Sequence, residues 1–204
     1  MRKQVLIIEI GGIAATQSQE ERRVVKYDID QAHTHLGFTA RHLAVSTVRG
    51  RFNKFEGSFE GPDDDFTKAR GEVKIEVASL ESRSDDRDNH LRSADFFDVE
   101  KYPYITFKLN SIEPITLENF RVLGELTVKE TTRPITLDAT IEGRMPDPFG
   151  ARERLGISAR GQLNRMDFDL NWNGLAGTVP FASHTIKLEV DAEIVVKAAA
   201  LLPA

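Results

Sequence analysis

Alternation of apolar and polar residues is the feature of this chain that most restricts its fold. Six segments show a period of two, with one apolar face and one charged or polar face each. Successive side chains of a β-strand point to opposite sides, so this period predicts strands with one wet face, as in an antiparallel sheet. The segments are residues 34–42, 70–80, 104–112, 121–130, 133–143 and 184–196.

A sheet with one apolar face has to bury that face, and this chain offers few helices to cover it. Turn residues separate the expected strands, among them Gly61-Pro62, Pro114, Pro134 and the segment 146–150. Many amphipathic strands with few helices indicate a sandwich or a closed barrel. A closed sheet of about eight strands encloses a space that side chains fill or that one small ligand occupies.

One region, which begins near Ser82, lacks the period of two. Ser82 and Asp85 loosely resemble a helix-capping arrangement, and Leu91 shares a helical face with Arg87. We therefore predict a short helix at about residues 84–94. An isolated helix of this kind usually crosses or plugs an open end of a barrel.

Charged residues crowd this helix. Paired carboxylates act as catalytic acids and bases only where burial perturbs their pKa values. The neighbouring arginines favour solvated ion pairs instead, so we expect residues 87–95 to form a solvated helix. The acidic residues and the histidine are Asp85, Asp86, Asp88 and His90, and the arginines are Arg83, Arg87 and Arg92.

Length and charge exclude several classes of protein. The 204 residues suffice for one domain with a substantial core. A net charge of −5 argues against a broad nucleic-acid-binding surface, because phosphate contacts need clustered Lys and Arg. The chain contains no cysteine, which excludes disulfides, thiolate zinc sites and cysteine nucleophiles.

The ends of the chain differ from its middle. Residues 1–22 form an N-terminal extension that is a weak export signal or an edge strand, since Glu9 interrupts its apolar run. We expect the barrel to span residues 23–197 and residues 198–204 to be a tail. The protein is expected to be cytoplasmic, or periplasmic or secreted if residues 1–15 act as a signal. No run of the ~18 to 20 apolar residues that a membrane span needs occurs, so stable membrane insertion is not expected.

No catalytic motif rises above background. The serines show no GxSxG elbow, and neither a Walker-type nor a GxGxxG loop occurs. His33 and His35 would share one side of a strand, but no third ligand follows at a diagnostic spacing, so no metal site is predicted. His42 ends the apolar face of its strand. It is either a hydrogen-bonded core residue or the polar anchor of an apolar ligand pocket.

The interior can be empty or filled. The chain has 12 phenylalanines and one tryptophan, and several phenylalanines fall on inward faces. Small residues on those faces leave space. These residues favour an elongated apolar cavity, and a tightly filled core is the alternative. The small residues are Ala40, Gly124, Ala139, Ala159 and Gly161.

Several stretches together resemble the YceI-like, polyisoprenoid-binding family. The resemblance runs from about Tyr27 to Val195 in the family's order of segments. The matching stretches are YDIDQAHTHLGFTARHL, STVRGRFNKFEGSF, RDNHLRSADFFDVEKYPYITF, GELTVKETTRP and DPFGARERLGISARGQLNRMDFDL. One departure is Glu130, which replaces the glycine of a G-x-T turn. The turn type is expected to differ, because a non-glycine residue adopts a positive φ at a cost.

This resemblance implies an all-β fold, an elongated, antiparallel, eight-stranded lipocalin-like barrel. It also implies a polyisoprenoid chain, such as an isoprenoid quinone or a polyprenyl lipid, bound in an apolar lumen for carriage, storage or sequestration. The lipid is a ligand, and no cofactor and no catalytic residue come with the resemblance. The alternative is an enzyme that acts on an isoprenoid or quinone head group, with His42 as its candidate residue. A homodimer is possible.

We expect the lipid tail to lie along the inward faces and the head to lie near a barrel mouth. His42 is the expected polar contact of the head, with Arg41 or Arg165 as alternatives. Phe96 and Phe97 are expected to turn inward and close the lumen beneath the helix. The predicted ligand-binding residues are Leu36, Phe38, Ala40, His42, Ile75, Leu91, Phe96, Phe97, Phe107, Leu126, Leu137, Ala139, Ile157 and Phe168.

Overall fold

The computed structural model describes residues 23–172, 174–176, 178–197 and 200–201. Their long strands are β1 (Arg23–Ile29), β2 (His35–His42), β3 (Ser46–Phe52), β4 (Phe55–Pro62), β5 (Arg70–Glu76), β7 (Tyr104–Pro114), β8 (Asn119–Val128), β9 (Thr131–Pro146), β10 (Glu153–Asn164) and β13 (Ala182–Val196). The short strands are β6 (Leu80–Glu81), β11 (Leu175–Ala176), β12 (Val179–Pro180) and β14 (Ala200–Leu201). The helices are η1 (Gln31–His33), η2 (Phe66–Lys68), η3 (Val77–Ser79), η4 (Arg165–Phe168) and α1 (Asp85–Arg92).

Eight strands form a closed antiparallel barrel, in the order β1-β4-β5-β7-β8-β9-β10-β13. The barrel closes where β1 pairs with β13, with Tyr27 opposite Val196 and Ile29 opposite Ile194. Closure leaves the apolar face of every strand inside and the charged face in water, because side chains alternate across the sheet. The predicted eight-stranded barrel is confirmed.

Three long strands are each broken once, into β1 and β2, into β3 and β4, and into β5 and β6. β1 and β2 both run antiparallel to β13, while β3 pairs with β2 and β4 pairs with β1. β5 and β6 are the two parts of the third broken strand: β5 pairs with β4, and β6 pairs with β3. The breaks lie side by side and are joined by hydrogen bonds, from Gln31 Nε2 to the Asn53 carbonyl (3.4 Å) and from Lys54 N to Ser79 Oγ (3.0 Å).

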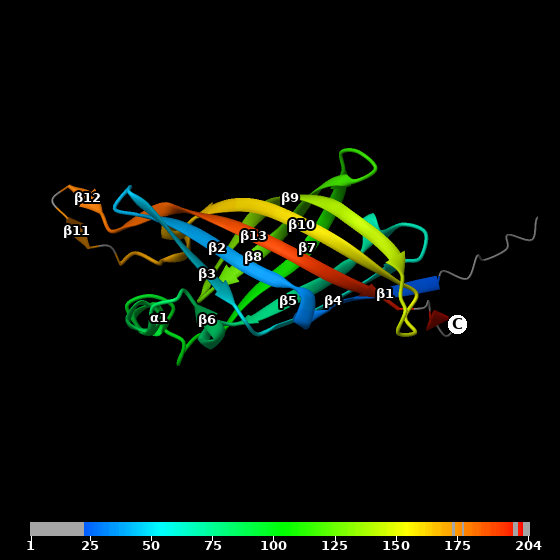
Figure 1. The fold of residues 1–204 in the computed structure, drawn as a ribbon, viewed down its shortest axis with the longest axis horizontal. Helices are drawn as coiled ribbons and strands as arrows, with labels where there is room; N and C mark the ends of the chain where they lie inside the picture. The colour runs from blue at the N-terminus through cyan, green and yellow to red at the C-terminus, as the bar shows by residue number, and fades with distance from the viewer. Residues whose placement is uncertain (1–22, 173, 177, 198–199, 202–204) are drawn as a thin grey trace, which may run out of the picture.

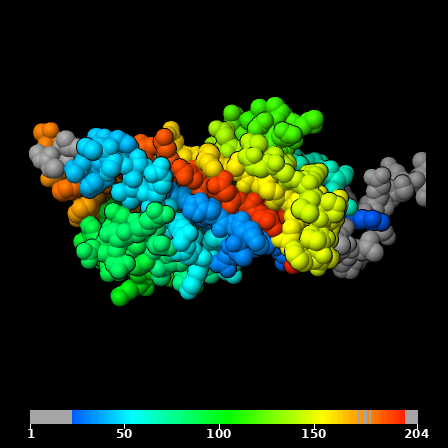
Figure 2. All heavy atoms as spheres, in the orientation of Figure 1, coloured from blue at the N-terminus to red at the C-terminus, as the bar shows by residue number. Residues whose placement is uncertain are grey.

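Beyond this line of breaks the wall is incomplete. Within the described chain, β6 pairs with β3 and not with β7, so the sheet separates between β6 and β7. The segment that links these two strands contains α1. Figure 1 shows α1 at the same end of the barrel as the β2–β3 turn and the β11–β12 hairpin, with the start of β1 at the opposite end. Figure 2 shows the same elongated shape, with these segments gathered at one end.

The predicted helix is present over Asp85–Arg92, but the expectation that its charged groups are solvated is wrong for Asp88. The Asp88 residue is only 4% exposed, and its carboxylate accepts hydrogen bonds from the backbone N–H (3.0 Å) and the hydroxyl of Ser82. Sequence spacing could not show this contact, because Ser82 follows β6 and lies outside the helix.

The arginines of the helix also bond elsewhere. Arg87 donates to the hydroxyl (2.7 Å) and carbonyl of Ser82, and Arg92 donates to the Ala78 carbonyl (3.0 Å) and the Leu80 carbonyl. Because β6 has a paired neighbour on one side only, its backbone needs such partners. These arginines therefore fasten α1 to the broken strand at the barrel end.

Two apolar clusters lie inside the barrel. One gathers around Val77, Phe96 and Phe168 at the α1 end. The other consists of Val25, Leu155, Ile194 and Val196, together with partly buried neighbours, at the β1 end. Val25 is 0% exposed and Val196 is 1% exposed, so this second cluster seals the β1 end of the barrel.

The turn expected to be unusual has its positive φ at Lys129 (55°), not at Glu130. The Glu130 carboxylate instead accepts hydrogen bonds from Tyr102 Oη (2.6 Å) and Lys101 Nζ (3.3 Å). At the C-terminal end, Ala200–Leu201 pairs with β1 as strand β14, inside the segment expected to be a tail. Residues 1–22, expected to be an extension, lie outside the described residues. None of the helices in the described chain has the length and apolar character that crossing a bilayer requires.

Candidate functional site

The barrel encloses a cavity of about 710 Å³, lined by side chains from all eight barrel strands and from α1. A volume in this range is typical of sites that enclose most of a small ligand. Every residue predicted to bind the ligand lies in its wall. These are Leu36, Phe38, Ala40, His42, Ile75, Leu91, Phe96, Phe97, Phe107, Leu126, Leu137, Ala139, Ile157 and Phe168.

The cavity follows the long axis of the barrel. On β13 the lining residues run from Ala182 at one end to Ile194 at the other. At ~3.3 Å per residue this stretch measures ~40 Å along the strand, or ~30 Å along the axis for a typical strand tilt. The space is therefore a long tunnel, comparable to the ~30 Å hydrocarbon thickness of a bilayer.

Glycines behind aromatic rings keep the tunnel open. A Cβ atom at Gly50 would overlap the ring of Phe38 on the paired strand, and one at Gly124 would overlap the ring of Phe107. Gly124 was expected to leave space in the lumen directly. It does not line the cavity, but it allows the Phe107 ring to lie against the wall.

On the outer face of the barrel wall near the sealed β1 end, Arg154 binds three carboxylates. It donates to Asp30 (2.9 Å), Asp147 and Glu193. These hydrogen bonds raise the pKa of Arg154. Burial pulls the pKa of Asp30 upward, but the hydrogen bonds from Arg154 and His33 outweigh it and leave this pKa below its usual value.

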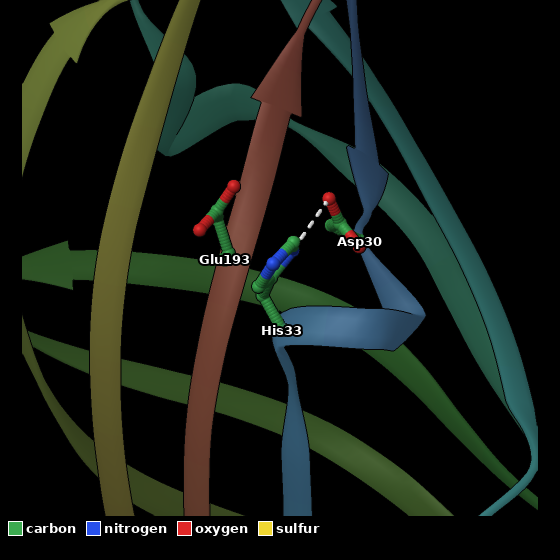
Figure 3. A group of neighbouring side chains, drawn as sticks. All are labelled: Asp30, His33 and Glu193. Atoms are coloured by element: carbon green, nitrogen blue, oxygen red, sulfur yellow. Dashed lines mark ion pairs between the residues drawn. The ribbon is translucent and has the colours of Figure 1, made fainter.

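Figure 3 shows Asp30, His33 and Glu193 as close neighbours, with the His33 ring turned toward Asp30 and an ion pair of 3.1 Å between these two. The expected ligand atoms of these three residues lie within 4.8 Å of one another, a spacing that could hold a metal ion. The Arg154 guanidinium, however, already contacts both carboxylates. The positive charge that a metal would supply is therefore present in the protein.

The opposite end of the tunnel is polar. Charged and polar residues of the wall gather here, on β2, on α1 and on η4. Toward the sealed end the polar lining residue is Thr34, whose Oγ1 accepts a hydrogen bond from the backbone N–H of Glu193 (3.1 Å). The mouth residues are Arg41, His42, Asp86, Arg87, His90 and Arg165. A ligand with a polar head and an apolar tail matches this division.

His42 is oriented by the backbone. Its Nδ1 lies 2.8 Å from the carbonyl oxygen of Phe181, and its ring stacks on the Phe181 ring at 6.2 Å between centroids. A carbonyl only accepts, so Nδ1 carries the proton and Nε2 of the neutral ring remains an acceptor. His42 can therefore accept a hydrogen bond at the mouth.

The charge pattern of the helix predicts a solvated His90, and no residue pattern predicts a site role for Trp172. Both line the tunnel, with ring centroids 4.4 Å apart and Phe96 against each ring. The helical spacing from Arg87 to His90 and Leu91 could have identified His90, because residues three and four apart share a helix face. The sequence contains no comparable signal for Trp172.

Arg165 is the most buried cation of the mouth, with 2% of its surface exposed. Its Nε donates to the Ser183 carbonyl (3.1 Å), and its Nη1 donates to the carbonyls of Leu170 and Trp172 (3.1 Å). Its Nη2 is buried without a hydrogen-bond partner among the described residues. Burial lowers the pKa of this guanidinium.

A closed antiparallel barrel with a long apolar tunnel, sealed at one end and polar at the other, defines a lipocalin-like ligand-binding protein. The comparison with protein families gives the group within this class. The YceI-like domain matches residues 27–195, so the chain belongs to the YceI-like family.

Relatives cover most of this chain. A UPF0312 protein of Staphylococcus aureus is 35% identical over 150 residues, which is 74% of this chain and 85% of that protein. A UPF0312 protein of Photorhabdus laumondii is 33% identical over 169 residues, 83% of this chain and 87% of that protein. Both relatives share the greater part of the barrel.

Solved structures share the fold. The YCEI protein of Campylobacter jejuni has a TM-score of 0.64 and 29% identity, and the match covers 78% of this chain and 89% of that one. BcnA of Burkholderia cenocepacia has a TM-score of 0.70 and 18% identity, over 84% and 100%. A polyisoprenoid-binding domain from Saccharophagus degradans has a TM-score of 0.58 and 15% identity, over 84% and 98%.

Proposed function

We propose that this protein binds a long-chain polyisoprenoid lipid, such as an isoprenoid quinone or a polyprenyl lipid, and carries, stores or sequesters it. The observation that carries this proposal is the tunnel, which is apolar along its length and polar at one mouth. The name of the Saccharophagus degradans domain, which has the same fold, supports this choice of ligand. Membership of the YceI-like family is consistent with it.

The tail is the part of the ligand that the tunnel accommodates. Moving a CH₂ group from water into an apolar environment contributes about 0.8 kcal/mol, so each isoprenoid unit adds several times this amount. A long tail is then held out of water without polar contacts. It would extend toward Ile194 at the sealed end, with the head beside His42 at the mouth.

The environment of His42 at the mouth supports lipid binding rather than catalysis on the lipid's head group. An enzyme acting on the head would need an activated base, and a histidine base is commonly oriented by a carboxylate. His42 is oriented by a backbone carbonyl, and within the described chain no carboxylate forms a hydrogen bond or an ion pair with its ring. We therefore infer a non-enzymatic role.

Native mass spectrometry of the purified protein, incubated with a series of prenyl chain lengths, tests the proposal. We expect one polyisoprenoid per protein. The variant Ala139→Phe, which fills the lumen, should lose it, whereas Thr136→Phe on the outer face of the same strand should retain it. Protein that stays empty with every chain length would refute lipid binding.

A further inference from the structure

Arg165 holds residues 170–172, here called the covering segment, against the mouth of the tunnel. Its three hydrogen bonds go to backbone carbonyls, at Ser183 on β13 and at Leu170 and Trp172 in the segment after η4. Leu170 and Trp172 line the tunnel, as Arg165 does. These bonds use Nε and Nη1, so they explain two of the three guanidinium nitrogens.

The third nitrogen, Nη2, is unexplained by the fold. It is buried and has no hydrogen-bond partner within the described chain. None of the described carboxylates forms an ion pair with Arg165 either. The guanidinium carbon lies over the Phe96 ring, 5.8 Å from its centre, and a ring face accepts no conventional hydrogen bond from Nη2. Buried donors in proteins nearly always have an acceptor, and a buried charge without one is costly.

The other arginines of the mouth have partners. Arg41 donates to Thr47 Oγ1 (3.1 Å) and to the carbonyls of Ala44 (2.7 Å) and Val45 (3.1 Å). Arg87 donates to Ser82. Among the arginines of the mouth, Arg165 thus has a guanidinium nitrogen, Nη2, that is buried without an acceptor among the described residues.

We propose that Arg165 Nη2 donates a hydrogen bond to an oxygen of the ligand's head, so that the protein selects polyisoprenoids whose head carries an acceptor oxygen. A guanidinium has donors only, so the head group must accept. A quinone carbonyl and a phosphate share this chemistry. The inference rests on the proposed function and adds the class of head group.

The head group determines how the lipid partitions between the protein and a membrane. A polyisoprenoid tail is surrounded by hydrocarbon in a bilayer and by apolar side chains in the tunnel, so the tail gains little on transfer between them. A charge-assisted hydrogen bond at Arg165, formed away from water, is available only in the protein. Arg165 then determines which lipids leave the membrane.

The test compares three ligands with the same tail: a hydrocarbon, a quinone and a phosphate monoester. Their transfer from phosphatidylcholine vesicles to the protein is followed by the fluorescence of Trp172, which is the one tryptophan of the chain. We expect the quinone, the phosphate or both to be taken up about tenfold better than the hydrocarbon, the difference typical of one hydrogen bond to a charged group. The arm with the stronger preference identifies a carbonyl or an anionic head.

In Arg165→Met the ratio of oxygen-bearing lipid uptake to hydrocarbon uptake should fall to within about threefold, whatever the loss of the covering contacts does to uptake of all three ligands. A loss that is equal for all three ligands would show that Arg165 only fastens the covering segment, and would overturn the proposal. Should the variant not fold, the wild-type series decides alone, because a hydrocarbon taken up as well as the oxygen-bearing lipids overturns it too. Uptake of no ligand would instead refute the proposed function.

Discussion

The ring of Phe38 lies across Gly50, its partner on the neighbouring strand, and occupies the space that a side chain at position 50 would fill. Gly50→Ala should push this ring into the tunnel and shorten the space for a tail. We expect fewer bound lipids per protein by native mass spectrometry. Gly143→Ala is the control, because a Cβ there meets no atom within 4 Å. Equal lipid content in both variants would contradict this role of Gly50.

Tail length should determine affinity until the tunnel is full. Each added isoprenoid unit buries further CH₂ groups at about 0.8 kcal/mol each, and the gain should stop once the tail exceeds the tunnel's ~30 Å. Competition in water, without a membrane that would shelter the tail equally well, between quinones of increasing chain length measures this. An affinity that is independent of tail length would mean that the ligand does not enter the tunnel.

Phe96 and Phe97 pack beneath α1, with ring centroids 6.2 Å apart, and both line the tunnel. Replacing both with serine should remove apolar contacts at the mouth and speed the release of bound lipid. Dissociation into excess vesicles measures the rate. Because Phe149 is exposed and does not line the tunnel, Phe149→Ser is a suitable control that should release lipid at the wild-type rate.

Asp88 joins α1 to Ser82 and should matter for stability. In Asp88→Asn, one of the two Ser82 donors loses its acceptor, and an unsatisfied buried donor costs about 1–3 kcal/mol. We expect faster hydrogen exchange over residues 80–100. Asp85→Asn, at an exposed position of the same helix, should leave exchange unchanged. Identical exchange in the two variants would show that the Ser82 contact does not hold the helix.

The Arg154 cluster should contribute stability that depends on pH. Hydrogen bonding to Arg154 lowers the pKa of Asp147 below its ordinary value of 3.8. A carboxyl group with a lowered folded-state pKa stabilises the fold above that ordinary value and loses this effect as the pH falls through the lowered pKa.

Arg154→Met should therefore lower the melting temperature most at neutral pH, and the difference from wild type should shrink below about pH 4. Thermal denaturation across this range measures it. Arg144→Met, which removes the ion pair (3.7 Å) between the exposed Arg144 and the half-buried Glu153, should have little effect at any pH. A difference that stays constant with pH would contradict the assignment.

The period of two predicted the barrel and its inward faces, because alternation is a local property of each strand. Leu36 and Phe38 could be placed from their own segment. The three strand breaks could not, since they depend on contacts such as Lys54 with Ser79, 25 residues apart. The role of Arg154 was hidden for the same reason, as Asp30 lies 124 residues away.

Side chains at the mouth show where local patterns fail. His90 and Asp88 both belong to a charged helix and looked solvated, yet His90 packs on Trp172 and Asp88 bonds Ser82. Which face of a short helix is buried depends on what it covers, and that is set by the gap between β6 and β7. Arg165 was recognisable as a candidate, but only the folded chain shows that its Nη2 has no partner among the described residues.

A crystal structure of the protein saturated with an isoprenoid quinone tests the central claim most directly. Continuous density should run from a head beside Arg165 and His42, along the tunnel past Leu137, to Ile194 at the sealed end. A tunnel filled by its own side chains, with the quinone bound on the outer surface of the barrel, would contradict lipid binding in the lumen.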